Sequence, residues 1–234
     1  MLLDSLTAID GCRNYNSWLA SHFLSWLRGD VIEIGSGIGS LAQYYDLAAV
    51  NSACLTDISA SMLGRLESRF ASHPKCRIRE LDILMPSGLP DDMRSGFDCL
   101  ICLNVLEHID DDGQALARMY DLLKPEGRLL LLVPALPFLY GSIDKAAGHY
   151  RRYARRGMAD LAGSVGFVTE NSYYVNFFGI FTWILSSRIL RRQNISVAGC
   201  RVLDRLVPVL RFMESWLHPP IGQSLVYIGR KPAG

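Results

Sequence analysis

The sequence of 234 residues predicts an α/β fold, in which a doubly wound, mostly parallel sheet is covered by helices on both faces. Between residues 31 and 134, short apolar runs alternate with amphipathic segments, which is typical of parallel strands buried on both faces. A glycine-rich turn directly follows the first run. With 50% hydrophobic and 20% charged residues, the composition also excludes disordered, collagen-like and disulfide-scaffold proteins.

Each element of this fold is predicted from its own local pattern. Aromatic and leucine side chains recur at helical spacing over residues 14–28, which predicts an amphipathic helix. Buried strands are expected at five apolar runs, namely 31–34, 52–56, 76–81, 97–105 and 128–134. Helices are expected between them, namely from the glycine turn to about 47, over 59–70 with Ser59 as its N-cap, and over 111–123.

The regular alternation ends after Pro134. Residues 134–153 show no period and predict a long loop, and long loops in compact domains are commonly functional. The elements expected after it are a helix at about 155–165, a strand at 167–174, an apolar helix at about 176–190, a helix at about 201–213 and a last strand at 224–230.

Two cysteines form a CxxC pattern, but the pattern does not indicate a metal site. Cys99 and Cys102 lie in the apolar run FDCLICLNV. In a strand, positions three apart face opposite sides of the sheet, so the two thiols cannot share an ion. We expect reduced core cysteines and no bound metal.

The net charge of +1 conceals two halves of opposite charge. Residues 1–140 carry 11 basic and 18 acidic residues, a net of −7, whereas residues 141–234 carry 13 and 5, a net of +8. Of the 24 basic residues, 20 are arginines. Arginine favours bidentate recognition of carboxylate or phosphate, although genomic base composition explains such usage equally well.

The N-terminal residues do not predict export. The first ten residues, MLLDSLTAID, have an acid and no basic residue before the apolar stretch, so they do not resemble a secretory signal, and we expect a cytoplasmic protein. The most apolar stretch, FFGIFTWIL, has about half of the roughly 20 residues that a spanning helix needs. It predicts a buried helix or lid, or else peripheral membrane contact aided by Arg188, Arg191 and Arg192.

The strongest local signal is VIEIGSGIGS at residues 31–40, where a strand runs into Gly35, Gly37 and Gly39 and then into the next segment. Glycines let the backbone turn tightly and approach a ligand closely. Glu33 lies inside the strand, where a buried carboxylate needs donors or a cation. Asp57 ends the second strand, 20 residues after Gly37, where a doubly wound fold presents an acid to ribose hydroxyls.

Polar residues also follow the third and fourth strands. Asp82 is placed to accept from an adenine amine, with Ile83 and Leu84 as apolar contacts, or else is a turn residue. The run NVLEHI puts Asn104, Glu107 and His108 at the carboxyl edge of the sheet, where ligands bind in open α/β folds. Alternatively, Glu107 or His108 caps a helix.

Five segments of this chain resemble, in order, the successive motifs of class I S-adenosylmethionine-dependent methyltransferases. They are VIEIGSGIG, CLTDIS, ELDI, FDCLICLNVLEHIDD and LLKPEGRLLLLVP. The resemblance covers residues 31–134. It implies a Rossmann-like sheet of seven strands, an antiparallel last strand at 224–230, a helical cover after strand five, and S-adenosylmethionine as cofactor with S-adenosylhomocysteine as product.

The resemblance also implies roles for parts of the chain. A single domain is expected over 1–234, with an N-terminal helical segment at 1–29, a cofactor-binding half at 30–134 and an acceptor-binding half at 135–234 that contains a helical insertion at about 176–213. The glycine turn would contact the methionine part of the cofactor, Asp57 the ribose and Asp82 the adenine. The cofactor contacts implied are Tyr15, Glu33, Gly35, Ser36, Gly37, Gly39, Asp57, Ile58, Met62, Asp82, Ile83, Leu84, Leu103, Asn104, Val105 and His108.

The segment LYGSIDKAAGHYRRY is similar to bacterial members linked to glycan, lipid or secondary-metabolite modification. It suggests a small-molecule acceptor that is anionic or linked to a lipid or glycan. Candidate catalytic residues are His108, Asp144 and His149, and a base is needed only for an acceptor that is protonated at working pH. Candidate acceptor contacts are Tyr140, Tyr150, Arg151, Arg152 and Tyr153. Arg151 and Arg152 could instead begin a solvated helix or pair with the acidic half.

Other functions fit the sequence less well. A noncatalytic cofactor-binding or scaffold protein would keep the same motifs, so it stays the main alternative. An NAD-dependent oxidoreductase is disfavoured by the GxGxG spacing and by Glu33. Nucleic acid is not an expected partner, because the arginines are dispersed among apolar segments instead of forming a basic run. The oligomeric state is left open.

Overall fold

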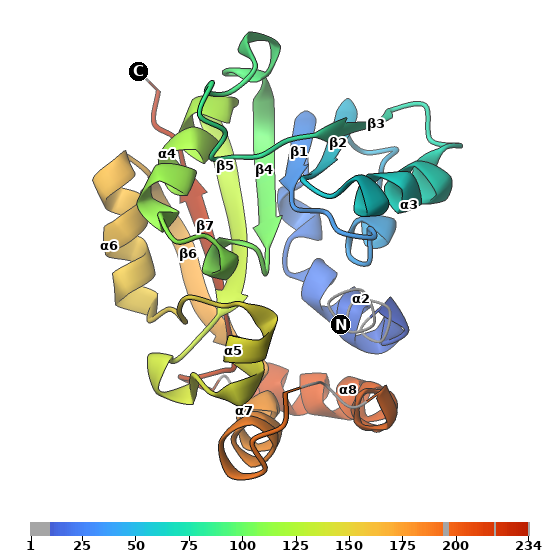
Figure 1. Cartoon of the computed structure of the whole chain (residues 1–234), viewed down its shortest axis with the longest axis vertical. Helices are drawn as coiled ribbons and strands as arrows, with labels where there is room; N and C mark the ends of the chain where they lie inside the picture. Colours follow the sequence, from blue (N-terminus) through green and yellow to red (C-terminus); the bar gives the residue numbers. More distant parts are fainter. Residues whose placement is uncertain (1–9, 194–196, 218, 234) are drawn as a thin grey trace.

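The computed structural model describes residues 10–193, 197–217 and 219–233, and its centre is a seven-stranded sheet (Figure 1). The order of the strands is β3-β2-β1-β4-β5-β7-β6. The strands are β1 (Asp30–Ile34), β2 (Ser52–Asp57), β3 (Cys76–Glu80), β4 (Phe97–Leu103), β5 (Leu123–Pro134), β6 (Val168–Val175) and β7 (Ser224–Arg230).

The strand pairing confirms the predicted fold class. β1 pairs in parallel with β2 and β4, β2 with β3, and β4 with β5, whereas β7 is antiparallel to both of its neighbours. The strand order changes direction between β1 and β4. In doubly wound sheets, ligands bind outside the carboxyl ends of the strands at such a switch point.

Helices cover both faces of the sheet and its carboxyl edge. The α-helices are α2 (Arg13–Ser21), α3 (Ala60–Phe70), α4 (Asp112–Leu122), α5 (Ser142–Ala147), α6 (Arg155–Val165), α7 (Phe177–Trp183) and α8 (Val197–Leu217). A π-helix, η6 (Ile184–Ile189), continues α7. Figure 1 shows α5, α7 and α8 at the end of the molecule toward which β4 points, and this is the helical cover expected after strand five. Within the described residues, no helix is both long and apolar enough to cross a bilayer.

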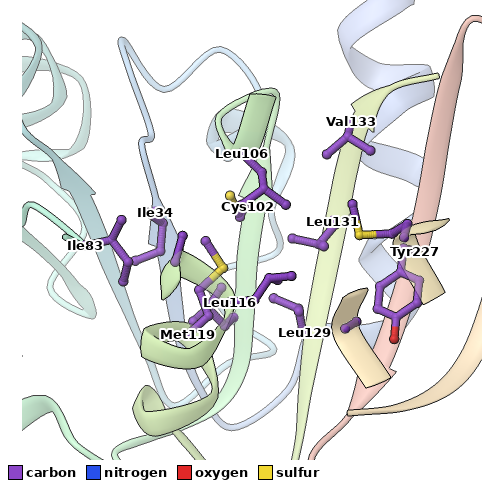
Figure 2. Close-up of a cluster of buried hydrophobic side chains, with 14 of the residues drawn as sticks. Ile34, Ile83, Cys102, Leu106, Leu116, Met119, Leu129, Leu131, Val133 and Tyr227 are labelled. Atoms are coloured by element: carbon purple, nitrogen blue, oxygen red, sulfur yellow. The ribbon is translucent and has the colours of Figure 1, made fainter. Parts of the chain in front are cut away.

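The core consists of two apolar clusters, one on each face of the sheet. Along β4, Leu100 and Cys102 belong to the cluster with α4 and α6, part of which Figure 2 shows. Cys99 and Ile101 belong to the cluster with α2 and α3. This alternation follows from the period of two in a strand. The prediction that Cys99 and Cys102 are buried on opposite faces is therefore confirmed.

Two predicted elements are wrong in type. A helix from the glycine turn to about residue 47 does not form, and only the 3-10 turn η2 (Ala42–Tyr44) follows the glycines. The glycines of the turn adopt positive φ, which interrupts helical geometry, and Tyr45 turns inward. The loop at 134–153 contains η5 (Pro137–Leu139) and α5, because local caps at Gly141 and Gly148 define a short helix that hydrophobic periodicity does not detect.

Two helices have different limits from those predicted. The helix at 14–28 ends at Ser21 and gives way to the 3-10 turn η1 (Leu24–Trp26), and the helix at 201–213 extends over all of α8. Ser59 occupies the N-cap position of α3 as predicted, but its side chain makes no capping bond. Asp57 Oδ1 accepts from the Ser59 amide instead, at 2.9 Å.

Candidate functional site

The glycine turn follows the last residue of β1, at the edge of the sheet where the parallel strands end. Gly35 and Gly37 have φ angles of +67° and +56°, which side chains rarely tolerate. A Cβ on Gly35 would lie 2.5 Å from Val105 Cγ2, so this glycine is required for packing. Among the described residues, a Cβ on Gly37 would meet nothing within 4 Å, so none of them closes off the turn there. A ligand can approach the backbone at Gly37.

Asp57 ties this turn to the end of β2. Its Oδ2 accepts from the Gly37 amide at 2.9 Å, and the Ser36 amide donates to the Thr56 carbonyl at 2.7 Å. The next residue, Ile58, is 69% exposed and offers apolar surface beside the carboxylate. Asp57 therefore lies beside the glycine turn, as the sequence predicts, while its role toward a ribose stays a prediction.

Glu33 is the buried carboxylate of β1, with 4% of its surface exposed. Its Oε1 accepts from the Tyr45 hydroxyl at 3.0 Å, whereas its Oε2 has no hydrogen-bond partner among the described residues. Burial raises the pKa of Glu33 to about 7, although bonds from Tyr45 and Ser36 oppose the rise. A buried carboxylate oxygen without a partner is costly, and a cationic ligand would satisfy it.

The remaining predicted cofactor contacts lie around the same edge of the sheet. Asp82 is exposed and its Oδ1 accepts from the Leu84 amide at 2.9 Å, which is the alternative role of a turn residue. Asn104 has a positive φ of 54° directly after β4. Four apolar residues are more enclosed than these two: Met62, Ile83 and Leu103 are buried, and Val105 is half-buried. Tyr15 lies on α2, and its hydroxyl accepts from Asn176 Nδ2 at 3.4 Å.

A second group of side chains follows β4 in the 3-10 turn η4 (Leu106–His108). Glu107 is 1% exposed, its Oε2 has no partner among the described residues, and burial raises its pKa to about 8. The His108 ring packs perpendicular to the His149 ring with centroids 4.6 Å apart. Burial lowers the pKa of His108 to about 4, so this imidazole is neutral near pH 7.

The structure brings Asp144, His149 and Arg152 together. Asp144 is fully buried, and its Oδ1 accepts from His149 Nδ1 at 3.0 Å and from Arg152 Nε at 2.8 Å. The Gly141 amide donates to its Oδ2 at 2.8 Å. Burial acts to raise the pKa of Asp144, but bonds from His149, Arg152 and Gly141 hold it below its usual value. An ionised Asp144 fixes the orientation of the His149 ring.

Arg152 also contacts the cover of the site. Its guanidinium donates to the Ala135 carbonyl at 3.0 Å and lies over the Trp183 ring at 4.5 Å. All of these contacts are internal, so the buried guanidinium holds the loop after β5 against α7.

Arg151 pairs with the acidic half of the chain, which was the alternative left open for it. Its Nη1 lies 3.0 Å from Asp112 Oδ2, and its Nη2 donates to the Asp110 carbonyl at 2.6 Å. Tyr153 is buried and donates to the same Asp112 oxygen at 2.9 Å.

The two other tyrosines of the segment differ in exposure. The Tyr140 hydroxyl donates to the His149 carbonyl at 2.7 Å, whereas Tyr150 is 56% exposed. Of the predicted acceptor contacts, Tyr150 presents the most surface to solvent.

The three side chains at the end of β4 also form a donor set for an ion. Glu107, His108 and His149 place one ligand atom each within 4.8 Å of one another. Two imidazoles and a carboxylate could hold a divalent metal. Sequence reasoning did not find this set, because His149 lies 41 residues after His108 and reaches it only through the fold.

Three other supporting residues were missed. Tyr45 binds Glu33, Trp183 covers Arg152, and Asn176 caps α7 by accepting from the Gly179 amide at 3.0 Å. Only Asn176 has a sequence signal, since an asparagine directly before an apolar helix is typical of an N-cap.

Comparison with known proteins shows which family this chain resembles. A family model described as a methyltransferase domain matches residues 32–129, the segment that forms β1 to β5 and the glycine turn. The match coincides with a seven-stranded sheet whose seventh strand is antiparallel. Residues 32–129 of the chain are therefore similar to methyltransferase domains. The resemblance in the sequence is thereby confirmed.

Curated relatives of the chain support the same resemblance. An uncharacterized methyltransferase of Mycobacterium tuberculosis is 32% identical over 130 residues, which are 56% of this chain and 61% of that protein. The ubiquinone/menaquinone biosynthesis C-methyltransferase UbiE of Pectobacterium atrosepticum is 30% identical over 152 residues, 60% of this chain and 58% of that protein. The chain thus spans less than two thirds of the length of these relatives.

A solved structure shows the same fold. The crystal structure of a putative methyltransferase from Bacillus halodurans matches 87% of this chain and 93% of its own, with a TM-score of 0.60 and 17% identity. The chain shares with it the fold.

Proposed function

We propose that the protein transfers a methyl group from S-adenosylmethionine to a small-molecule acceptor. The observation that carries the proposal is the unpartnered Oε2 atom of Glu33, buried next to a glycine turn that is open at Gly37. A cationic cofactor fits there, because its charge would balance the buried carboxylate. When bound, the cofactor supplies a methyl group on a positively charged sulfur for in-line displacement by the acceptor.

The residues around the turn have distinct tasks in this proposal. The backbone from Gly35 to Gly39 lies against the methionine part, Asp57 accepts from the ribose hydroxyls, and Asp82 accepts from the adenine amine. Ile58 supplies the apolar surface on which the adenine ring rests, since 69% of its surface is exposed beside Asp57. Glu33 supplies the negative charge beneath the turn.

An acceptor that is methylated on a hydroxyl group is activated at Glu107, His108 and His149. A hydroxyl acceptor has to lose its proton, whereas a carboxylate or phosphate oxygen needs no base. Because ionised Asp144 can only accept, His149 donates through Nδ1, and the neutral form of the ring then has its lone pair on Nε2. Arg152 acts as a positioning residue, since its 2.8 Å bond to Asp144 holds the carboxylate that orients His149.

The acceptor is anionic or linked to a lipid or glycan. The support is the net charge of +8 over residues 141–234, which contain the segment around His149 and the cover of the site. Arginine is suited to bind carboxylate and phosphate groups. Because Arg152 and Arg151 are engaged with Asp144 and Asp112, the arginines that face solvent on the cover are the ones available to such an acceptor.

Two measurements test the proposal. Calorimetry compares the binding of S-adenosylmethionine and NAD, and a preference for NAD would overturn it. A screen of carboxylates, phosphates, sugars and lipid-linked glycans then measures S-adenosylhomocysteine formation with and without a chelator, and the product mass identifies the methylated group. Cofactor binding without turnover on any acceptor would favour the noncatalytic alternative.

A matched pair of histidine variants tests the acceptor cluster. His149→Ala removes the ring held by Asp144, whereas His73→Ala changes an exposed histidine after α3. We expect turnover to fall by about 10²-fold or more in the first variant, as for loss of an acid-base group, and to be unchanged in the second. Equal turnover in both variants would remove His149 from the mechanism.

A further inference from the structure

Helix α8 carries an apolar stripe on its outer face. The side chains of Val202, Leu206, Val209, Phe212 and Trp216 recur every three or four residues, and their exposed fractions are 60%, 50%, 59%, 73% and 80%. Residues at this spacing lie on one face of a helix. A surface helix normally turns such a stripe toward the core, so α8 has the reverse arrangement.

The inner face of α8 is held to the protein by polar contacts. Asp204 Oδ1 accepts from the Tyr15 amide at 2.9 Å, and the Glu214 carboxylate accepts from the Asn176 and Phe177 amides at 3.0 and 2.7 Å. Val207, between these two acids along the helix, is 3% exposed. These contacts fix the rotation of α8 and leave its apolar stripe outside.

A second stripe lies on α7 and η6. Phe181, Leu185 and Ile189 are spaced four residues apart and are 58%, 50% and 66% exposed. The opposite side of this helix is anchored by Ile180, which is 5% exposed, and by Ser187, whose Oγ accepts from the Ile143 amide at 3.2 Å. Since Glu214 of α8 binds the first turn of α7, the two helices adjoin (Figure 1).

All fully exposed charges on these elements are positive. Within the described parts of residues 177–217, the exposed charged side chains are Arg188, Arg191, Arg192, Arg201, Arg205 and Arg211. The only acids there, Asp204 and Glu214, are half-buried and bound to backbone amides. Apolar stripes with tryptophan and phenylalanine beside clustered arginines are typical of helices that lie in the interface of a bilayer.

We propose that α7, η6 and α8 form a platform that docks on an anionic lipid bilayer without crossing it. A second copy of the chain is a poorer occupant, because a symmetric interface would place these arginines against their own copies. The platform covers the carboxyl edge of the sheet, so a docked protein would receive an acceptor directly from the lipid surface. This last step rests on the proposed function, whereas docking itself does not.

Vesicle binding by the full chain tests the docking. The probe is sedimentation with vesicles of phosphatidylcholine alone or mixed with phosphatidylglycerol, at low and high salt. We expect binding to the anionic vesicles only, weakened by salt, because surface charges are screened beyond about 10 Å at 0.1 M ionic strength. Absence of binding, or equal binding to neutral vesicles, would overturn the proposal.

Two sets of variants separate the electrostatic contribution to vesicle binding from the apolar one. The double change Arg201→Glu with Arg205→Glu, next to Val202 and Leu206 of the stripe, should weaken binding at least about tenfold, since each basic residue near an anionic surface contributes to affinity. The matched control is Arg156→Glu, an exposed arginine on α6, which should bind normally. Phe212→Glu with Trp216→Glu should also abolish binding, with Val168→Glu on the edge strand β6 as control.

Two further readouts keep the outcomes distinct. Circular dichroism establishes that the variants are folded, and cofactor calorimetry in the absence of lipid reports on the proposed function independently. If the wild type forms a dimer that the Phe212 and Trp216 changes dissociate, and binds no vesicles, the face is a subunit interface and the proposal is wrong.

Discussion

Replacing Glu33 by glutamine should stabilise the protein at alkaline pH while weakening cofactor binding. The carboxyl is 4% exposed, and burial raises its pKa from the ordinary value of 4.5 to about 7. Between these two pH values the folded chain holds a proton that the unfolded chain has released. Stability therefore falls as pH rises through this window, and above pH 7 the full cost of the buried charge is present.

The size of the effect follows from the pKa. At 1.36 kcal/mol per pH unit, a rise from 4.5 to about 7 corresponds to about 3 kcal/mol at pH 8 and to little at pH 4.5. Glutamine keeps the shape of the side chain and can still accept from Tyr45, but it does not ionise. We expect Glu33→Gln to gain about 3 kcal/mol relative to wild type between pH 4.5 and pH 8.

Urea denaturation of both proteins at the two pH values measures this difference. Every other titrating group is common to both chains, so its contribution cancels in the comparison. The matched control is Glu67→Gln, which removes an exposed carboxyl on α3. A Glu33→Gln effect of the same size at both pH values would refute the reasoning, because Glu33 would then titrate normally.

Cofactor affinity completes the test. A cation near Glu33 favours the ionised carboxylate, so the affinity of the wild type for S-adenosylmethionine should increase as pH rises through 7. Glu33→Gln should bind more weakly and lose this pH dependence. Calorimetry at pH 6 and pH 8 measures both effects, and an affinity unaffected by the substitution would exclude Glu33 from the cofactor site.

Three other substitutions have defined outcomes. Arg152→Met should lower the free energy of unfolding by about 3–5 kcal/mol, because it leaves Asp144 as a buried charge without its ion pair. Urea denaturation measures the loss, and a value under about 1 kcal/mol would contradict this reasoning. Burial lowers the pKa of His22 to about 4, so wild-type stability should fall as pH drops from 6.5 toward 4, and His22→Gln should remove that part of the acid sensitivity in urea titrations. Leu116→Ala, in the α4 cluster of Figure 2, should cost about 2–5 kcal/mol in the same assay, and a near-neutral effect would mean that the core collapses around the cavity.

The strands and the glycine turn could be predicted because their signals are local. Continuous apolar runs identify buried parallel strands, and the three glycines mark the turn after β1. The partner of Glu33 could not be predicted in this way. A helix through residue 47 would have placed Tyr45 by helical periodicity, whereas the 3-10 turn directs its hydroxyl to the carboxylate.

The contacts among Asp144, His149 and Arg152 are also a tertiary effect. Gly148 ends α5 with a φ of 79°, and this left-handed residue turns the chain so that His149 and Arg152 both reach back to Asp144. The sequence shows charged residues in a segment without a period, and it gives no sign of which of them are buried. Ordinary base rates favour solvent exposure for such residues.

The stripe on α8 reverses the usual meaning of hydrophobic periodicity. Apolar residues at helical spacing predict a face that packs on the core, and the sequence accordingly predicts a helical cover. The structure instead anchors the polar face through Asp204 and Glu214, which places Phe212 and Trp216 in solvent. Only the positions of the anchoring acids distinguish the two arrangements, and their partners lie in other parts of the chain.

The charges proposed to act in the two halves of the chain therefore differ in their exposure to solvent. The carboxylate of Glu33 is buried, so its attraction to a cationic cofactor is weakly screened by salt, whereas the six arginines between residues 188 and 211 are exposed. Raising ionic strength should then release the protein from anionic lipid while leaving cofactor affinity nearly unchanged. A parallel loss of both would mean that the cofactor, too, is held by exposed charge, and that the buried carboxylate is not what binds it.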